Sequence, residues 1–130
     1  MKIYDDKNNL LAVFIKKDDI KEVRNFETSN DEEFQIGSFN LEKNTIIESH
    51  IHLNQKRIIS KTSEALVVIE GEMEVTIYDN ERKFIEKLLV QDGDTIALLN
   101  GGHGIKINSQ CRFVEIKQGP YIEEEDKVRF

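Results

Sequence analysis

Short apolar runs, separated by turn-forming residues, recur along this chain at intervals of about 8–12 residues. Half of the 50 apolar residues are β-branched, with 17 Ile and 8 Val, and only three are Ala. Branched side chains fit a pleated sheet and lose rotamer freedom in a helix. About eight to ten short strands at this spacing predict an all-β fold, either an antiparallel sandwich or a barrel.

The expected strands divide the 130 residues into three parts. A small N-terminal hairpin pairs Ile3-Tyr4 with Leu10–Ile15, and residues 16–25 give only a weak helical or irregular signal. Further strands are expected over residues 34–41, 45–53, 64–70, 72–78, 83–90, 95–99, 103–107 and 112–117. The length suits a single domain, with hairpin and connector (1–33), barrel (34–118) and a tail (119–130) whose acidic run predicts a solvated segment.

The charge balance argues against two classes of partner. The 18 Lys and Arg against 25 Asp and Glu give a net charge of −7, whereas a non-specific grip on nucleic acid or an anionic membrane needs a basic surface. There is no run of 18 apolar residues, and the start of the chain turns acidic before any signal peptide forms. A lone Cys111 cannot form an internal disulfide. These features predict a soluble cytoplasmic protein that binds a small molecule.

The histidines carry the strongest hint of chemistry. His50 and His52 stand two residues apart, so on a strand both project from one face. A divalent metal is the usual bridge between two such imidazoles, and an exposed surface pair is the alternative. Glu64 opens a nearly apolar strand, where it either finds a partner or keeps its carboxylate in water at the strand end.

These residues resemble the two motifs of the cupin superfamily. The first motif, G-x5-H-x-H-x3/4-E-x6-G, aligns with Asn44, His50, His52, Glu64 and Gly71, and the second, G-x5-P-x-G-x2-H-x3-N, aligns with Gly93, Leu99, Gly101 and His103. The resemblance implies a cupin-type double-stranded β-helix, a jelly-roll barrel. It also implies a divalent transition metal (Fe, Mn, Ni, Zn or Cu) held inside by His50, His52, Glu64 and His103. Glu48 competes with Glu64, because eleven residues separate His52 from Glu64 and because Glu48, His50 and His52 share one strand face.

Other residues have both a functional and a plain interpretation. Arg57 and Lys61 are candidates for holding an anionic group of a substrate, although a basic segment of this kind is more often a solvated loop. Tyr78, Phe39 and Phe113 are expected to line the barrel interior as core aromatics, and Cys111 is expected to be a buried spectator. The glycines around His103 suit a tight turn rather than a phosphate loop, because neither Lys-Ser/Thr nor a helix follows.

Three functions remain open from the sequence. The first is a metal-dependent enzyme of oxygenase or isomerase type acting on a small polar organic substrate. The second is a metal-independent isomerase or epimerase of a sugar or nucleotide sugar, and the third is a ligand-binding or sensor module without turnover. The apolar runs 10–15 and 65–69 exceed what one core face needs, which indicates a homodimer in which each partner adds a strand to the other's sheet.

Overall fold

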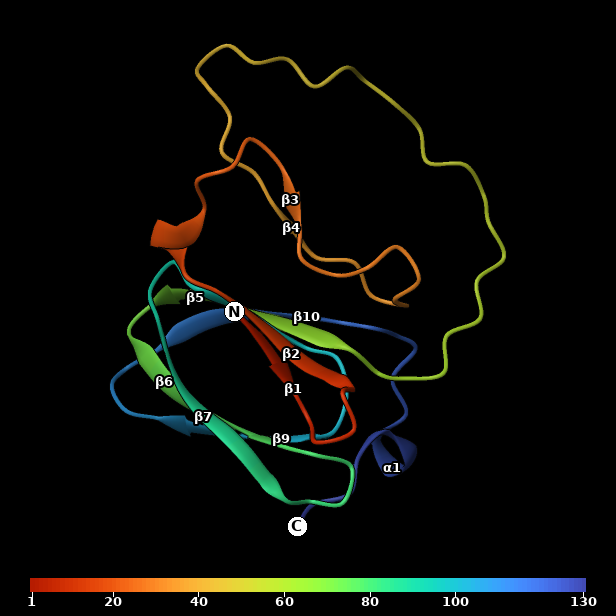
Figure 1. Ribbon diagram of the computed structural model, residues 1–130, viewed down its shortest axis with the longest axis vertical. Helices are drawn as coiled ribbons and strands as arrows, with labels where there is room; N and C mark the ends of the chain where they lie inside the picture. The colour runs from red at the N-terminus through yellow and green to blue at the C-terminus, as the bar shows by residue number, and fades with distance from the viewer.

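Two antiparallel sheets face each other in the computed structural model, which describes residues 1–130 except for the side chain of Glu125 (Figure 1). The larger sheet has the strand order β1-β2-β8-β5-β10, and the smaller has the order β7-β6-β9. Their strands are β1 (Lys2–Tyr4), β2 (Leu10–Ile15), β5 (Glu64–Glu70), β6 (Glu72–Tyr78), β7 (Phe84–Gln91), β8 (Thr95–Leu98), β9 (Gly102–Ile107) and β10 (Arg112–Lys117). The fold is therefore all-β, as the sequence predicts, but the described residues form no closed barrel.

Three short elements complete the structure. A two-stranded ribbon pairs β3 (Asn25–Phe26) with β4 (Gly37–Ser38). A 3-10 turn η1 (Lys17–Asp19) follows β2, and a single helical turn α1 (Glu123–Asp126) lies near the C-terminus. No helix among the described residues is long and apolar enough to cross a membrane.

The core lies between the two sheets and follows the alternation of the sequence. On β6 the side chains of Met73, Val75 and Ile77 are fully buried, and they pack against Leu66 and Val68 of β5. Period-two alternation puts these apolar side chains on one face, where burial removes them from water. A second cluster covers the outer face of the larger sheet and consists of Val13, Ile15, Ala65, Ala97 and Leu99, with Leu10, Ile20, Phe34 and Ile36 packed over it.

Residues with positive φ set the turns between strands. Gly71 has φ of 86°, and an added Cβ would stand 2.1 Å from the carbonyl oxygen of Gln110. Gly101 has φ of 72° and is equally close-packed, since an added Cβ would stand 2.2 Å from the carbonyl oxygen of Tyr78. Asn44 also lies in the left-handed region, with φ of 70°, which Asn tolerates better than most residues.

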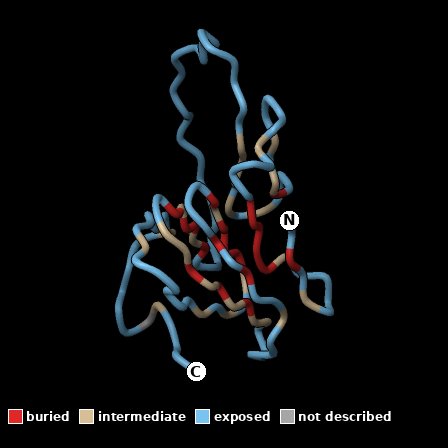
Figure 2. The backbone as a smooth tube through the Cα atoms, turned by 90° about the vertical axis from the view of Figure 1, so that its left-hand side faces the viewer, coloured by how far each residue is buried: buried red, intermediate tan, exposed pale blue. Residues whose placement is uncertain are grey.

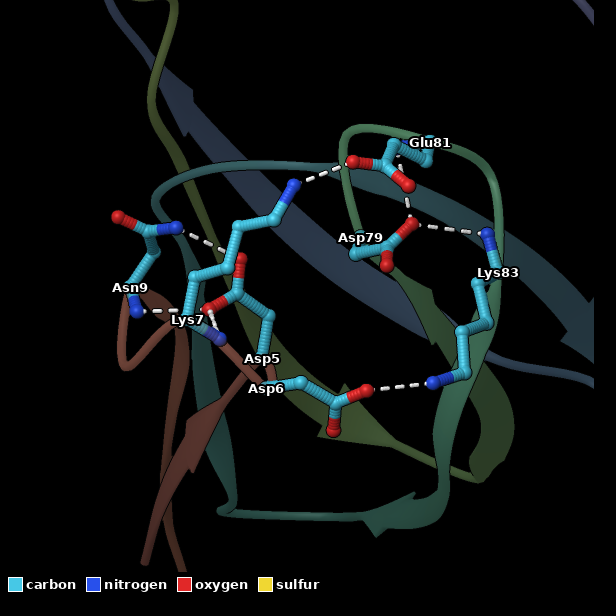
Figure 3. A network of polar contacts seen from close by, with 7 residues as sticks. All are labelled: Asp5, Asp6, Lys7, Asn9, Asp79, Glu81 and Lys83. Carbon is cyan, nitrogen blue, oxygen red and sulfur yellow. Dashed lines mark hydrogen bonds and ion pairs between the residues drawn. The ribbon is translucent and has the colours of Figure 1, made fainter.

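A polar network ties the N-terminal hairpin to the turn between β6 and β7 (Figure 3). Lys83 pairs with Asp6 at 2.5 Å, and Lys7 pairs with Glu81. Each acidic partner raises the pKa of its lysine through a side-chain hydrogen bond. The network links one end of the larger sheet to one end of the smaller sheet, on the side where residues 79–82 border a cleft.

Two predicted strands are wrong. Of residues 34–41 only Gly37–Ser38 is a strand, and residues 45–53 have no regular structure at all. A strand needs backbone partners, and none of the described residues supplies them to this stretch. Residues 41–62, which we call the arm, instead loop away from the sheets and are almost wholly exposed (Figures 1 and 2).

The C-terminal tail is mostly exposed, as its acidic run predicts, but one of its carboxylates is held against a strand. The Nζ atom of Lys117 on β10 lies 2.9 Å from a carboxylate oxygen of Asp126, and both side chains are largely buried. This ion pair raises the pKa of Lys117, and the same ammonium group lies 4.5 Å from the ring centroid of Tyr121. The tail is therefore anchored to β10 through Asp126, while Glu123, Glu124 and Lys127 remain exposed.

Candidate functional site

The two sheets are joined at one end by a carboxylate–imidazole pair. Glu64 is the first residue of β5, and His103 lies on β9 opposite the buried Ile77 of β6. Directly opposed residues share a face of the sheet, so the side chain of His103 lies on the inner face and meets Glu64 across the sandwich. The Oε1 atom of Glu64 lies 2.8 Å from Nε2 of His103, and the two side chains are 14% and 35% exposed.

This hydrogen bond favours the ionised form of Glu64. The bond from His103 lowers the pKa of Glu64 below its usual 4.5, in spite of partial burial, which acts in the opposite direction. Glu64 is therefore ionised at neutral pH and only accepts hydrogen bonds. Nε2 of His103 donates to this carboxylate, which leaves Nδ1 as the ring nitrogen that the pair does not use. A substrate proton or a cation would meet His103 at that nitrogen.

The pair opens into a cleft of about 710 Å³. Its walls combine charged, amide, hydroxyl and aromatic side chains, contributed by Thr62, Glu64, Tyr78, Asp79, Asn80, Arg82, Asn100, His103, Glu115, Asp126, Lys127, Arg129 and Phe130. Cavities of this size accommodate small organic ligands. Because acids, bases and amides are mixed, the lining suits a ligand with many hydrogen-bonding groups rather than an apolar one.

The C-terminus supplies one wall of the cleft. The ring of Phe130 meets that of Tyr78 edge to face, with centroids 5.1 Å apart. The guanidinium carbon of Arg82 lies 5.3 Å from the centroid of Phe130. Such aromatic and cation–π contacts hold the last residue against the sheet beside the Glu64–His103 pair.

The expected four-ligand metal site is not assembled within the chain. His50 and His52 do lie together, with ring centroids 5.1 Å apart, but both are exposed on the arm and Nδ1 of His50 contacts the carbonyl oxygen of Glu48. In the described part of the chain, no three His, Cys, Asp or Glu side chains are close enough to hold a metal ion. The structure thus brings together Glu64 and His103 and separates them from the His50–His52 pair, because residues 45–53 are not a strand of the sandwich.

Of the basic and aromatic residues singled out in the sequence, only one lines the cleft. Arg57 and Lys61 lie on the arm, exposed, and the cleft lining does not include them. Tyr78 lines the cleft as expected, whereas Phe39 is exposed and contacts Phe26 edge to face. Phe113 is also exposed, at the open end of the sandwich, so the expectation that Phe39 and Phe113 are core aromatics is wrong.

Cys111 packs against the core, and desolvation raises the pKa of its thiol. A raised pKa leaves little thiolate at neutral pH, which agrees with the expected spectator.

Sequence reasoning missed the cations that border the cleft, namely Arg82, Lys127 and Arg129. Arg82 follows the turn 79–81 and has φ of 67°, and the other two belong to a tail that looked solvated. The only sequence signal available was the apolar Val128 and Phe130 interleaved with Lys127 and Arg129, which is an unusual ending for a purely solvated segment.

Comparison with known proteins adds a family but no activity. A family model described as a domain of unknown function (DUF6016) matches residues 20–90, which is more than half of the chain. No curated protein matches the chain, and no solved structure matches it either.

Proposed function

The chain belongs to the DUF6016 family, and we propose that it binds a small polyhydroxylated organic molecule, of the sugar or sugar-phosphate class, in the cleft beside Glu64 and His103. The observation that carries this proposal is the hydrogen bond between Glu64 and His103 at the cleft wall. The rings of Tyr78 and Phe130 offer apolar surface for a sugar ring, and the carboxylates and amides around them offer hydrogen bonds to hydroxyl groups.

The chemistry proposed for this pair is proton transfer of isomerase or epimerase type. Glu64, ionised and hydrogen-bonded to Nε2, orients the imidazole and stabilises the cation that forms when Nδ1 takes up a proton. His103 then returns this proton to a neighbouring substrate atom, so the imidazole acts in turn as base and acid. Arg82 and Lys127 line the same cleft and suit a phosphate or carboxylate substituent of the ligand.

We also propose that the complete domain has the cupin-type double-stranded β-helix fold. Its support is local: Gly71, Gly93 and Gly101, which align with motif glycines, have φ of 86°, 85° and 72°, and Asn44 at a fourth motif position has φ of 70°. Left-handed backbone at these positions fits the tight turns that such motifs encode. The two sheets would then need further strands at their free edges to close.

A metal-dependent reaction on the same substrate class is the second candidate. It is favoured by the neighbouring His50 and His52 rings, which are exposed and so free to bind a cation. Because the four expected ligands do not fit a metal site as one chain is folded, we derive no step through a metal. This candidate requires the arm to bring His50 and His52 next to a Glu64–His103 pair.

Ligand binding is tested by thermal shift with a panel of hexose phosphates, pentose phosphates and hydroxy acids. We expect at least one sugar phosphate to raise the melting temperature of the wild-type protein and to have a far smaller effect on His103→Asn. Asp92→Asn is the matched control, because Asp92 is exposed and is absent from the cleft lining. If no sugar binds, or if His103→Asn binds as tightly as the wild type, the proposal is wrong.

Catalysis is tested separately, by the exchange of a carbon-bound hydrogen of the sugar for deuterium. In deuterated water, the active protein should introduce deuterium at a carbon next to the carbonyl of the bound sugar, detected by proton NMR. Binding without exchange in the wild type would leave a ligand-binding module and exclude the proton-transfer chemistry. Exchange that stops on chelation and returns with Fe²⁺, Mn²⁺, Ni²⁺ or Zn²⁺ would select the metal-dependent candidate.

A further inference from the structure

The arm exposes a dense group of large apolar side chains. Within 22 residues of chain it leaves Ile46, Ile47, Ile51, Leu53, Ile58 and Ile59 in solvent, and Ile51 is 89% exposed. Single exposed apolar residues are common on proteins, but six large ones within one segment are typical of an interaction surface. In Figure 2 the arm stands clear of the buried segments of the sandwich, so the chain itself does not cover it.

The sandwich has free strand edges to which this exposed apolar segment could add as a strand. Among the described residues β9 pairs only with β6, and β10 only with β5, so one edge of each strand carries unpaired backbone groups. Ile105 and Ile107 lie opposite Val75 and Met73, which are fully buried on the inner face. Although they share that face, Ile105 and Ile107 are 40% and 49% exposed. The space between the sheets is therefore open beside β9.

The free edge of β10 is open in the same way. Phe113 and Val114 are neighbours on a strand and so point to opposite faces, yet both are exposed. A long, exposed and apolar strand edge is a template for pairing with another strand. β10 carries three charged residues, Arg112, Glu115 and Lys117, whereas β9 carries Lys106 and no proline, so β9 is the less protected of the two edges.

The arm has the sequence pattern of the missing strand. If residues 45–53 are extended, one side carries Thr45, Ile47, Ser49, Ile51 and Leu53 and is mainly apolar, and the other carries Ile46, Glu48, His50 and His52 and is mainly polar. Such alternation is typical of a half-buried strand. When this stretch extends an antiparallel sheet, one side faces the interior and the other faces outward, and every backbone group gains a partner.

Two observations favour a second copy of the chain over the arm's own sandwich. Both ends of the arm are held: the backbone N–H of Asn40 donates to Glu22 O at 3.1 Å, and the backbone N–H of Ser60 donates to the carboxylate of Glu33 at 2.9 Å. The middle is thereby held away from the body (Figure 1). The charges are also complementary, because the arm has four basic and two acidic residues, whereas the rest of the chain has 14 basic and 23 acidic residues.

We propose that two copies of the chain exchange arms, so that residues 45–53 of each copy add a strand to the free β9 edge of the other. The apolar side bearing Ile47, Ile51 and Leu53 then covers the inner face beside Ile105 and Ile107, and the side bearing His50 and His52 faces outward. This inference concerns assembly and stands whether or not the cleft binds a sugar, because it rests on the arm and the strand edges alone.

The oligomeric state tests the proposal first. By light scattering over a range of micromolar concentrations, we expect the wild-type protein to have twice the chain mass of 15.1 kDa. Ile51→Asp should weaken the dimer by about tenfold or more, since a charge replaces an apolar side chain at the interface. Val23→Asp is the matched control, because Val23 is exposed on the connector outside the arm, and it should remain dimeric. Circular dichroism verifies that both variants keep their β-structure.

Cross-linking then shows which chain receives the arm. Every chain carries Cys111→Ser, one population carries His52→Cys, and a differently tagged population carries Lys106→Cys on β9, because both residues face outward in the proposed sheet. After mixing, a short bis-maleimide should join chains of different tags. A monomeric wild type would overturn the proposal. So would cross-linking only when both cysteines are in one chain, which would instead indicate that the arm folds back onto its own β9.

Discussion

Replacing Glu64 by Gln tests the energetic role of the carboxylate–imidazole pair. Gln keeps the shape and still accepts a hydrogen bond from Nε2 of His103, but it removes the charge. A hydrogen bond to a charged group contributes about 1.5–3 kcal/mol, against about 0.5–1.5 kcal/mol for a neutral pair. Because His103 is about one-third exposed, solvent screens part of the difference. We therefore expect Glu64→Gln to lower the free energy of unfolding by about 1 kcal/mol at neutral pH.

The direction of the pKa shift determines how the stability difference between wild type and Glu64→Gln changes with pH. The pKa of Glu64 is lower in the folded protein than its usual 4.5, so the charged form is the one that folding favours. Its stabilisation is complete above the unfolded-state pKa and is lost as the pH falls through the folded-state pKa. The difference between wild type and Glu64→Gln should therefore be largest near neutral pH and should shrink as the pH falls through the lowered pKa of Glu64.

Urea unfolding followed by far-ultraviolet circular dichroism measures both quantities, and the chain has no Trp for fluorescence. Glu70→Gln is the matched control on the same strand, since Glu70 pairs with Arg112 at a highly exposed position and should change stability by less than about 0.5 kcal/mol. Equal stability of wild type and Glu64→Gln near neutral pH would refute the reasoning. A difference that persists unchanged in acid would refute it as well.

The remaining predictions concern the framework around the site. Gly71→Ala should destabilise the protein by more than about 2 kcal/mol in urea unfolding, because it combines a positive φ with a clash against the Gln110 carbonyl, whereas Gly104→Ala should be nearly neutral, since an added Cβ there meets nothing within 4 Å. Equal effects of the two substitutions would contradict the turn geometry. Leu66→Ala should cost about 2–5 kcal/mol, because it leaves a cavity between the sheets, and a loss below about 1 kcal/mol would mean that this core is not packed as described.

The sandwich strands were predictable because each shows its own period and its own turn. On β6 the strict alternation of Met73, Val75 and Ile77 predicted the strand, and the buried inner face of β6 agrees with it. The same rule failed for residues 45–53, which alternate less strictly because Ile46 and Ile47 are adjacent, and which also lack a strand beside them. Alternation reports which face a strand would bury, whereas the presence of a backbone partner depends on residues elsewhere in the chain or in another molecule.

The candidate site was predictable in part. Glu64 was a candidate because a carboxylate at the entrance of an apolar strand needs a partner, and that partner is His103, 39 positions later in the chain. The sequence did not reveal that the C-terminal residues form a cleft wall, since Phe130 contacts Tyr78 through tertiary packing that has no local signature. It also placed Arg57 and Lys61 near the site, although the arm that carries them projects away from it.

Nitrogen-15 NMR of the histidine side chains tests the central claim most directly, because the chain has only three histidines to assign. At a pH where the imidazoles are neutral, His103 should keep its proton on Nε2, hydrogen-bonded to Glu64, and Glu64→Gln should change its shifts while His50 and His52 stay the same. Addition of a sugar that the protein binds should change the nitrogen-15 shift of Nδ1 of His103. If His103 instead carries its proton on Nδ1, or if its shifts do not respond to Glu64→Gln, the pair does not exist in solution and the proposed site has no basis.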